Sequence, residues 1–167
     1  PKTVDNDLPI TDHCPGYGSA AKYIATSMKE IIRDNSSFGV QKPTVCIVEI
    51  MGRNAGWLTA AAALSRGSDC EGPDAIYLPE RVFDMDAFME KVKELAAKKS
   101  SVVIAVSEGV QIADGRFVCE LGREVAVDAF GHKQMSGTAV ILAQKVAEET
   151  GLKTRAIEFS TLQRSAS

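Results

Sequence analysis

The run from Lys2 to Asp7 contains the densest group of side chains in this sequence that could do chemistry. It reads Lys-Thr-Val-Asp-Asn-Asp and combines an ammonium, a hydroxyl, an amide and two carboxylates. Asp5 could accept a proton from an attacking hydroxyl, and Lys2 could neutralise the charge of a phosphate. The same residues also suit an Asx-rich turn, which is the commoner role of an Asp-Asn-Asp triplet on its own. The run is therefore a candidate catalytic loop, with a plain turn as the alternative.

Two further segments follow predicted buried strands. In Met51-Gly52-Arg53, Gly52 would let a ligand approach the backbone and Arg53 offers several donors to phosphate oxygens. Glu108 follows a second buried strand, where its carboxylate could accept hydrogen bonds from sugar hydroxyls. A structural loop for the first segment, and a cap or salt bridge for Glu108, are the alternatives. The first segment lacks the glycine pattern of a Walker loop or a dinucleotide-binding loop.

Two arginines flank the end of the last predicted strand. Arg155 and Arg164 are nine positions apart and would suit the clamping of a phosphate monoester. Exposed arginines are common, so either one alone more often has a structural role. His13 and His132 have no serine or cysteine partner in a recognisable catalytic arrangement, and we assign them no role.

Hydrophobic periodicity predicts the elements that must position these side chains. We expect helices over residues 19–34, 57–66, 85–98 (with Asp84 as its N-cap) and 137–150 (ended by Gly151), and strands over 44–50, 75–78, 101–106 and 153–159. Asp114-Gly115 predicts a turn, and residues 123–129 a short helix. The alternation of strand and helix predicts an α/β fold, a parallel sheet with helices on its faces. In such sheets ligands bind beyond the carboxyl ends of the strands.

Composition limits the class of protein. The 167 residues, 45% of them hydrophobic and 25% charged, suit one folded domain rather than a disordered or fibrous chain. The net charge of −3 argues against a broad nucleic-acid or acidic-membrane surface, and no apolar run approaches the ~20 residues of a membrane helix. Four scattered cysteines argue against a zinc site or a disulfide framework and indicate reduced thiols in the cytoplasm.

Five segments, taken together and in order, resemble the phosphofructokinase family. They are residues 1–7, 50–53, 107–109, 154–156 and 162–164, which read Pro-Lys-Thr-Val-Asp-Asn-Asp, Ile-Met-Gly-Arg, Ser-Glu-Gly, Thr-Arg-Ala and Leu-Gln-Arg. The resemblance covers nearly the whole chain, and the predicted elements between the motifs also fit. It implies a truncated three-layer sandwich from a glycolytic enzyme that phosphorylates the 1-hydroxyl of fructose 6-phosphate to give fructose 1,6-bisphosphate.

The resemblance also implies roles for the matching residues. The catalytic positions are Lys2, Asp5 and Asp7, with Asp5 as the general base. The substrate-binding positions are Thr3, Val4, Asp5, Met51, Gly52, Arg53, Glu108, Arg155, Thr161 and Arg164. In the family, positions 51–53 and 108 bind the sugar, and positions 155 and 164 hold the 6-phosphate, one of them from a neighbouring subunit. The family's magnesium-associated aspartate would lie upstream of Pro1, so we expect no metal ligand within this chain and Mg²⁺ bound mainly by residues outside it.

Lys2 bears on the phosphate donor. In the family, lysine at this position is typical of pyrophosphate-dependent members and glycine of the ATP-using bacterial enzymes, so we expect pyrophosphate. An ATP-dependent enzyme of the same family is the alternative, and a non-catalytic sugar-phosphate-binding module is a third possibility. Thr161 and Thr44 stand where the bacterial enzymes carry a histidine and a subunit-crossing arginine, which alters the phosphate site shared between subunits.

The resemblance divides the chain into three parts. Residues 1–16 would be a catalytic loop of a larger domain, 17–160 the sugar-phosphate-binding α/β domain, and 161–167 the start of the return to the larger domain. Because both ends are polar and loop-like, we expect a fragment of a longer parent protein. We expect that parent to be a homodimer or homotetramer.

Overall fold

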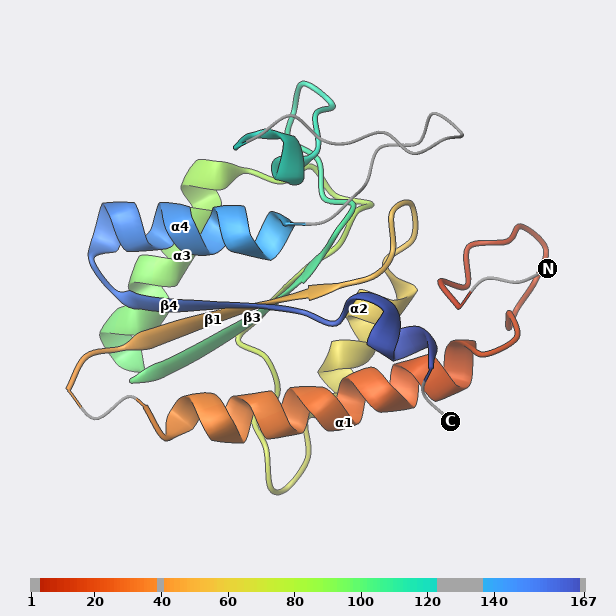
Figure 1. The fold of residues 1–167 in the computed structure, drawn as a ribbon, viewed down its shortest axis with the longest axis horizontal. Coiled ribbons are helices and arrows are strands. Elements are labelled where there is room, and N and C mark those ends of the chain that lie inside the picture. The colour runs from red at the N-terminus through yellow and green to blue at the C-terminus, as the bar shows by residue number, and fades with distance from the viewer. Residues whose placement is uncertain (1–3, 39–40, 123–136, 166–167) are drawn as a thin grey trace.

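The computed structural model describes residues 4–38, 41–122 and 137–165, and it shows one sheet covered by helices (Figure 1). The strands are β1 (Thr44–Ile50), β2 (Ala75–Tyr77), β3 (Ser101–Ser107) and β4 (Lys153–Glu158). The α-helices are α1 (Tyr17–Ser36), α2 (Trp57–Ala60), α3 (Met85–Lys98) and α4 (Thr138–Thr150). Three short 3-10 helices are η1 (Ala61–Ser65), η2 (Val118–Glu120) and η3 (Ser160–Arg164).

The sheet has the strand order β2-β3-β1-β4, and all three pairings are parallel. In this register Ile50 at the end of β1 pairs with Ser107 of β3, and Glu49 pairs with Glu158 of β4. The carboxyl ends of three strands therefore meet at one edge. The predicted α/β class and parallel sheet are confirmed.

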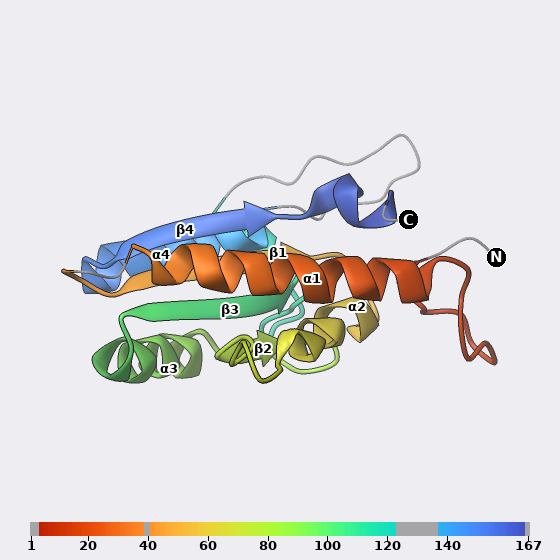
Figure 2. The same cartoon turned by 90° about the horizontal axis from the view of Figure 1, so that it is seen from below.

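The side chains of β1 and β3 alternate between two cores, as the pleat of a strand requires. One core contains Val45, Ile47, Val102, Ile104 and Val106, packed with residues of α3 and α4. The other contains Cys46, Val48, Ile50, Val103 and Ala105, packed with residues of α1 and α2. Both faces of the central strands are thus covered, which explains their nearly continuous apolar sequences and confirms the three-layer arrangement (Figures 1 and 2).

Local signals place most element boundaries. The Asp84 carboxylate accepts hydrogen bonds from the amides of Asp86 and Ala87, at 2.9 and 3.0 Å, which is the predicted N-cap of α3. Gly151 ends α4 in the left-handed conformation, at φ 65°. The predicted turn at Asp114-Gly115 is present, with the Gly115 amide donating to the carbonyl of Ile112 at 2.9 Å.

The bounds of α1, β2, β3 and α4 differ from the predicted ones by one or two residues at an end. Two further differences have a local cause, and one prediction cannot be compared with the structure. The helix expected over 57–66 is α2 followed by the 3-10 helix η1, and the tighter turn is closed by the Arg66 amide donating to Ala63 at 3.1 Å. β4 ends at Glu158 rather than at Phe159, because the chain turns into η3 there. The short helix expected over 123–129 lies outside the described residues.

All four cysteines are buried and free of disulfides. Of the helices in the described ranges, none combines the length and the apolarity needed to cross a membrane.

Candidate active site

Two loops at the carboxyl edge of the sheet are joined by hydrogen bonds. The Glu108 amide donates to the carbonyl of Ile50 at 3.0 Å, so the chain after β3 stays paired with the end of β1. The Gly52 amide donates to the Glu108 carboxylate at 3.3 Å, and the hydroxyl of Ser107 donates to the Gly52 carbonyl. The two segments singled out from sequence, 51–53 and 108, therefore form one connected unit.

Two glycines allow this close approach. Gly52 has φ 136°, and a Cβ there would lie 2.4 Å from the carbonyl oxygen of Ala55. A Cβ on Gly109 would lie 2.0 Å from the carbonyl oxygen of Arg53. Both distances are far inside contact range, so neither position accepts a side chain without movement of the 51–56 loop.

The 3-10 helix η3 brings a third segment to this edge. The Arg164 guanidinium Nε lies 3.1 Å from the sulfur of Met51. Gln163 is buried, its Oε1 accepts from the Met51 amide at 3.3 Å, and its Nε2 donates to the carbonyl of Ser160 at 2.9 Å. Gln163 thus fixes η3 against the loop that carries Met51.

A cavity of about 410 Å³ lies between these segments. Its lining residues are Glu49, Ile50, Met51, Arg53, Glu108, Glu158, Ser160, Thr161, Gln163 and Arg164. The structure therefore brings together five of the sequence-predicted binding residues: Met51, Arg53, Glu108, Thr161 and Arg164. Two guanidinium groups and three carboxylates in one cavity suit a ligand that has both an anionic group and hydroxyls.

The carboxyl group of Asp5 is close enough to this cavity to respond to its charges. Partial burial raises the pKa of Asp5, and the neighbouring Asp7 raises it further, while Arg164 and Arg53 lower it. The loop around it is held by Asn6, whose side-chain oxygen accepts from the Cys14 amide at 2.8 Å. Asp5 is thus a partly buried carboxyl group beside two cations, which is a suitable place for a proton acceptor.

The other predicted residues of this loop have different positions. Asp7 is exposed, and Val4 is half-buried and packs against the core under α1. Lys2 and Thr3 lie outside the described residues.

Glu108 has an unusual acidity. Burial raises its pKa to about 7, and the negative charge of Asp5 adds to this, whereas the Gly52 amide, Arg53 and Arg164 lower it. Near neutral pH Glu108 can therefore either accept or donate a hydrogen bond, which suits contact with a sugar hydroxyl.

Arg155 does not reach this cavity. It pairs with Cys46 in the first half of the β4 register, its guanidinium forms a 2.7 Å ion pair with Asp34, and it lies over the ring of Phe38. Three strand residues separate Arg155 from the end of β4, or about 10 Å. Within one chain Arg155 and Arg164 therefore do not line the same cavity. The expected role of Arg155 in a site shared between subunits stays a prediction.

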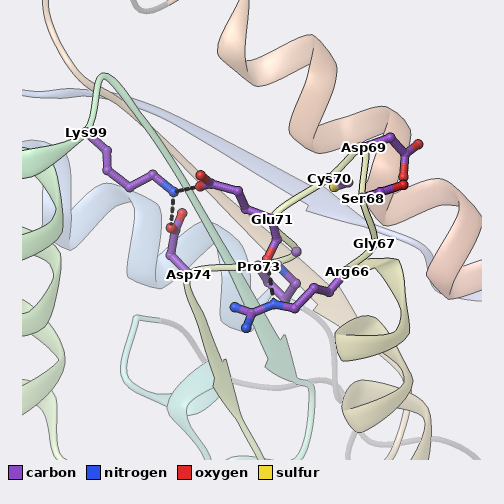
Figure 3. Close-up of a pocket in the computed structure, with 10 residues that line it drawn as sticks. Arg66, Gly67, Ser68, Asp69, Cys70, Glu71, Pro73, Asp74 and Lys99 are labelled. Carbon is purple, nitrogen blue, oxygen red and sulfur yellow. Dashed lines mark hydrogen bonds and ion pairs between the residues drawn. The ribbon is translucent and has the colours of Figure 1, made fainter.

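A larger cavity, of about 650 Å³, lies beside the loop that follows η1, and its carboxylates and Lys99 are held in ion pairs (Figure 3). Lys99 forms ion pairs of 2.7 Å with both Glu71 and Asp74. Asp69 pairs with Lys29 and Arg33 of α1. The carboxylates and Lys99 thus serve to fix the loop, and we place the candidate site at the smaller cavity.

Among the described residues, no group of three or more His, Cys, Asp or Glu side chains is arranged to hold a metal ion.

Comparison with known proteins identifies the family. The sequence model of the family described as phosphofructokinase matches residues 1–167. The chain belongs to the phosphofructokinase family. It is 46% identical over 166 residues to a pyrophosphate–fructose 6-phosphate 1-phosphotransferase from Xanthomonas campestris, which covers 99% of this chain and 39% of the relative. It is also 35% identical to a sulfofructose kinase from Alkalicoccus urumqiensis, over 98% of this chain and 41% of the relative.

Solved phosphofructokinase structures share the fold. The crystal structure of a pyrophosphate-dependent phosphofructokinase from Marinobacter aquaeolei matches with a TM-score of 0.80 and 40% identity, over 99% of this chain and 37% of that chain. The corresponding enzyme from Nitrosospira multiformis matches with a TM-score of 0.79 and 39% identity, over the same shares of the two chains. This phosphofructokinase chain therefore spans about two fifths of the length of these relatives.

The sequence does not predict the other five lining residues as site residues: Glu49, Ile50, Glu158, Ser160 and Gln163. Two of these have polar side chains that are buried, Glu49 within an apolar strand and Gln163 within a motif. The signal for Glu49 was available, because a single charged residue inside a seven-residue buried strand needs a partner or a function. Gln163 carried no such signal, since glutamine in a short polar segment is usually exposed.

Proposed function

We propose that the parent protein transfers a phosphoryl group from pyrophosphate to the 1-hydroxyl of fructose 6-phosphate, giving fructose 1,6-bisphosphate and phosphate. The observation that supports this most is that Arg53, Glu108 and Arg164, from three separate segments, line one cavity. The two arginines are also close enough to Asp5 to lower the pKa of its carboxyl group. Four relatives that are 43–46% identical to the chain are named pyrophosphate–fructose 6-phosphate 1-phosphotransferase.

We assign each group a part in the reaction. Arg164 and Arg53 hold anionic oxygens, and Glu108 takes hydrogen bonds from the sugar hydroxyls. Asp5 accepts the proton of the 1-hydroxyl as its oxygen bonds to phosphorus and the bridging oxygen of pyrophosphate leaves with phosphate. Positioning and charge stabilisation supply most of the catalysis in such transfers. We include Thr3, Gly52, Thr161 and Val4 among the substrate-binding residues, and Asp7 and Lys2 among the catalytic ones.

The remaining parts of the proposal concern groups outside this chain. We infer that Mg²⁺ assists the donor and is held mainly by residues outside it, since the described residues provide no metal-binding group of three. We further propose a cytoplasmic homodimer or homotetramer in which the Arg155 of one subunit serves the phosphate site of another. The position of Arg155 supports this arrangement, because it lies three strand residues before the carboxyl end of β4 and does not line the cavity of its own chain.

A donor assay tests the proposal. The parent protein is supplied with fructose 6-phosphate and either pyrophosphate or ATP, and fructose 1,6-bisphosphate is measured. We expect turnover with pyrophosphate, and Lys2→Gly to reduce it far more than it changes sugar binding. Turnover with ATP alone would favour the ATP-dependent alternative, and binding without turnover with either donor would favour a non-catalytic module. Sulfofructose should be tested in parallel, because a relative carries that specificity in its name.

A further inference from the structure

Glu49 is a buried carboxylate that the proposed reaction does not use. It is the sixth residue of β1, a strand in which all seven residues are buried, and its own exposure is 5%. Its register partners are Val106 on one side and Glu158 on the other. A buried carboxylate destabilises the folded state unless it is hydrogen-bonded, so the groups that bind it indicate its structural role.

The partners of Glu49 are the first amides of α4. Its Oε2 accepts a hydrogen bond from the Ala139 amide at 2.9 Å, and the Gly137 amide also donates to its carboxylate. Gly137 is the N-cap of α4 and has no side chain with which to cap it. A carboxylate is favoured at a helix N-terminus, where unpaired amides and the helix dipole present partial positive charge. Glu49 therefore caps α4 from the neighbouring sheet.

The capped end of α4 contacts the turn that carries Glu108. The hydroxyl of Thr138 donates to the carbonyl of Glu108 at 3.3 Å, while the Glu108 amide donates to the Ile50 carbonyl at 3.0 Å. The Glu108 backbone is thus held between β1 and α4. In Figure 1 the start of α4 lies near the carboxyl ends of the strands.

We propose that Glu49 is a positioning residue for Glu108: it anchors the N-terminus of α4 to β1 and thereby fixes the backbone that carries the sugar-binding carboxylate. The anchoring of α4 to β1 rests on the hydrogen bonds of Glu49 and Thr138. The effect on sugar binding rests on the proposed function.

Charges on the surrounding elements make this anchor dependent on pH. Burial raises the pKa of Glu49 to about 7, and the carboxylates of Glu158 on β4 and Glu108 after β3 add to this, whereas the two α4 amides lower it. Cys119 of η2 is also near, and burial raises the pKa of its thiol to about 11, so it is uncharged. The carboxylate form of Glu49, which the amides of α4 favour, is therefore lost as the pH falls below about 7.

Hydrogen exchange in the parent protein tests the anchor directly. Glu49→Gln keeps the shape but loses the charge and presents an NH₂ group to one amide, and Glu49→Met removes both acceptors. We expect amides at the start of α4 and in the 107–110 turn to exchange roughly 5-fold faster in Glu49→Gln, the size of effect expected from loss of a side-chain cap, and faster still in Glu49→Met. The control is Glu148→Gln, the same change at an exposed position of α4. Unchanged exchange in both Glu49 variants would overturn the proposal.

Kinetics test the effect on the sugar. With pyrophosphate as donor, Glu49→Gln should raise the KM for fructose 6-phosphate about 3- to 10-fold, since one positioning hydrogen bond is weakened, with kcat changed less. In Glu49→Gln the KM should depend less on pH between 6 and 8 than in wild type, because, of the two carboxyl groups, only Glu108 still titrates in this range.

Faster amide exchange with an unchanged KM and an unchanged pH profile would show that Glu49 only caps α4 and does not position Glu108. A wild-type protein without turnover would refute the proposed function, and the exchange of the 107–110 turn would still decide whether Glu49 positions Glu108.

Discussion

The backbone carbonyl of Arg53 occupies the space in which a side chain on Gly109 would begin. A Cβ at Gly109 would lie 2.0 Å from that oxygen and 2.6 Å from the carbonyl carbon. Both contacts are to backbone, so no rotation of a side chain relieves them. The backbone after β3 is therefore packed directly against the backbone of Arg53.

Gly109→Ala should displace the Arg53 loop. We expect the KM for fructose 6-phosphate to rise at least ~10-fold, since loss of a hydrogen bond to a charged group costs about 1.5–3 kcal/mol. Gly18→Ala is the control, because a Cβ there meets nothing within 4 Å and alanine favours the helix α1. Steady-state kinetics of both variants of the parent protein measure the effect. Equal KM values for the two variants would show that Arg53 does not contact the substrate from this position.

Asp5→Asn should abolish turnover but spare sugar binding. The amide keeps the shape of the side chain and cannot accept the proton, so kcat should fall roughly 100- to 10,000-fold. Asp86→Asn, an exposed position on α3, is the control. Turnover and the dissociation constant for fructose 6-phosphate are measured separately. Retention of more than a third of wild-type kcat would remove Asp5 from the role of base.

Gln163→Leu should weaken the packing of η3 against the Met51 loop, because it removes the hydrogen bond between the Gln163 side chain and the Met51 amide. The substitution leaves the Met51 amide and the Ser160 carbonyl without their side-chain partner, at a cost of about 1–3 kcal/mol for each buried group left unpaired. Because Arg164 is the next residue, binding of the sugar phosphate should weaken more than kcat falls. Gln163→Glu keeps the acceptor for the Met51 amide and should retain more of the affinity. Calorimetric titration with fructose 6-phosphate compares the two variants, and the reverse order of affinities would contradict this role.

The stability of the chain should fall as the pH rises from about 4.5 to about 7. The pKa of Glu49 is raised from 4.5 to about 7 in the folded state, so the folded state binds its proton more tightly than the unfolded chain does. This contribution is fully present below pH 4.5 and is lost as the pH rises through 7, on the order of 3 kcal/mol in all. Urea denaturation at pH 4.5, 6 and 7.5 should show a steeper decline for wild type than for Glu49→Gln. Parallel declines for the two proteins would place the pKa of Glu49 near its ordinary value.

The sequence by itself determined the elements, because the information that places them is local. The periodicity of apolar residues located the helices and strands, and Asp84 and Gly151 act on amides and carbonyls within a few residues of themselves. The parallel order of the sheet followed from the alternation of strand and helix. From that order alone, Arg53 and Glu108 could be expected at one edge.

Only the tertiary structure decided which distant groups meet. Arg155 is the third residue of β4, a strand that runs toward the site. The rest of the strand therefore separates Arg155 from Arg164, although the two residues are close in sequence. Glu49 finds its partners 90 residues away in α4, and Gln163 finds Met51 at a separation of 112 residues. The pKa values of Glu49 and Glu108 depend on burial and on carboxylates from other segments, as does the pKa of Asp5 on two arginines. Burial and through-space charge are properties of the packed chain, and local sequence does not encode them.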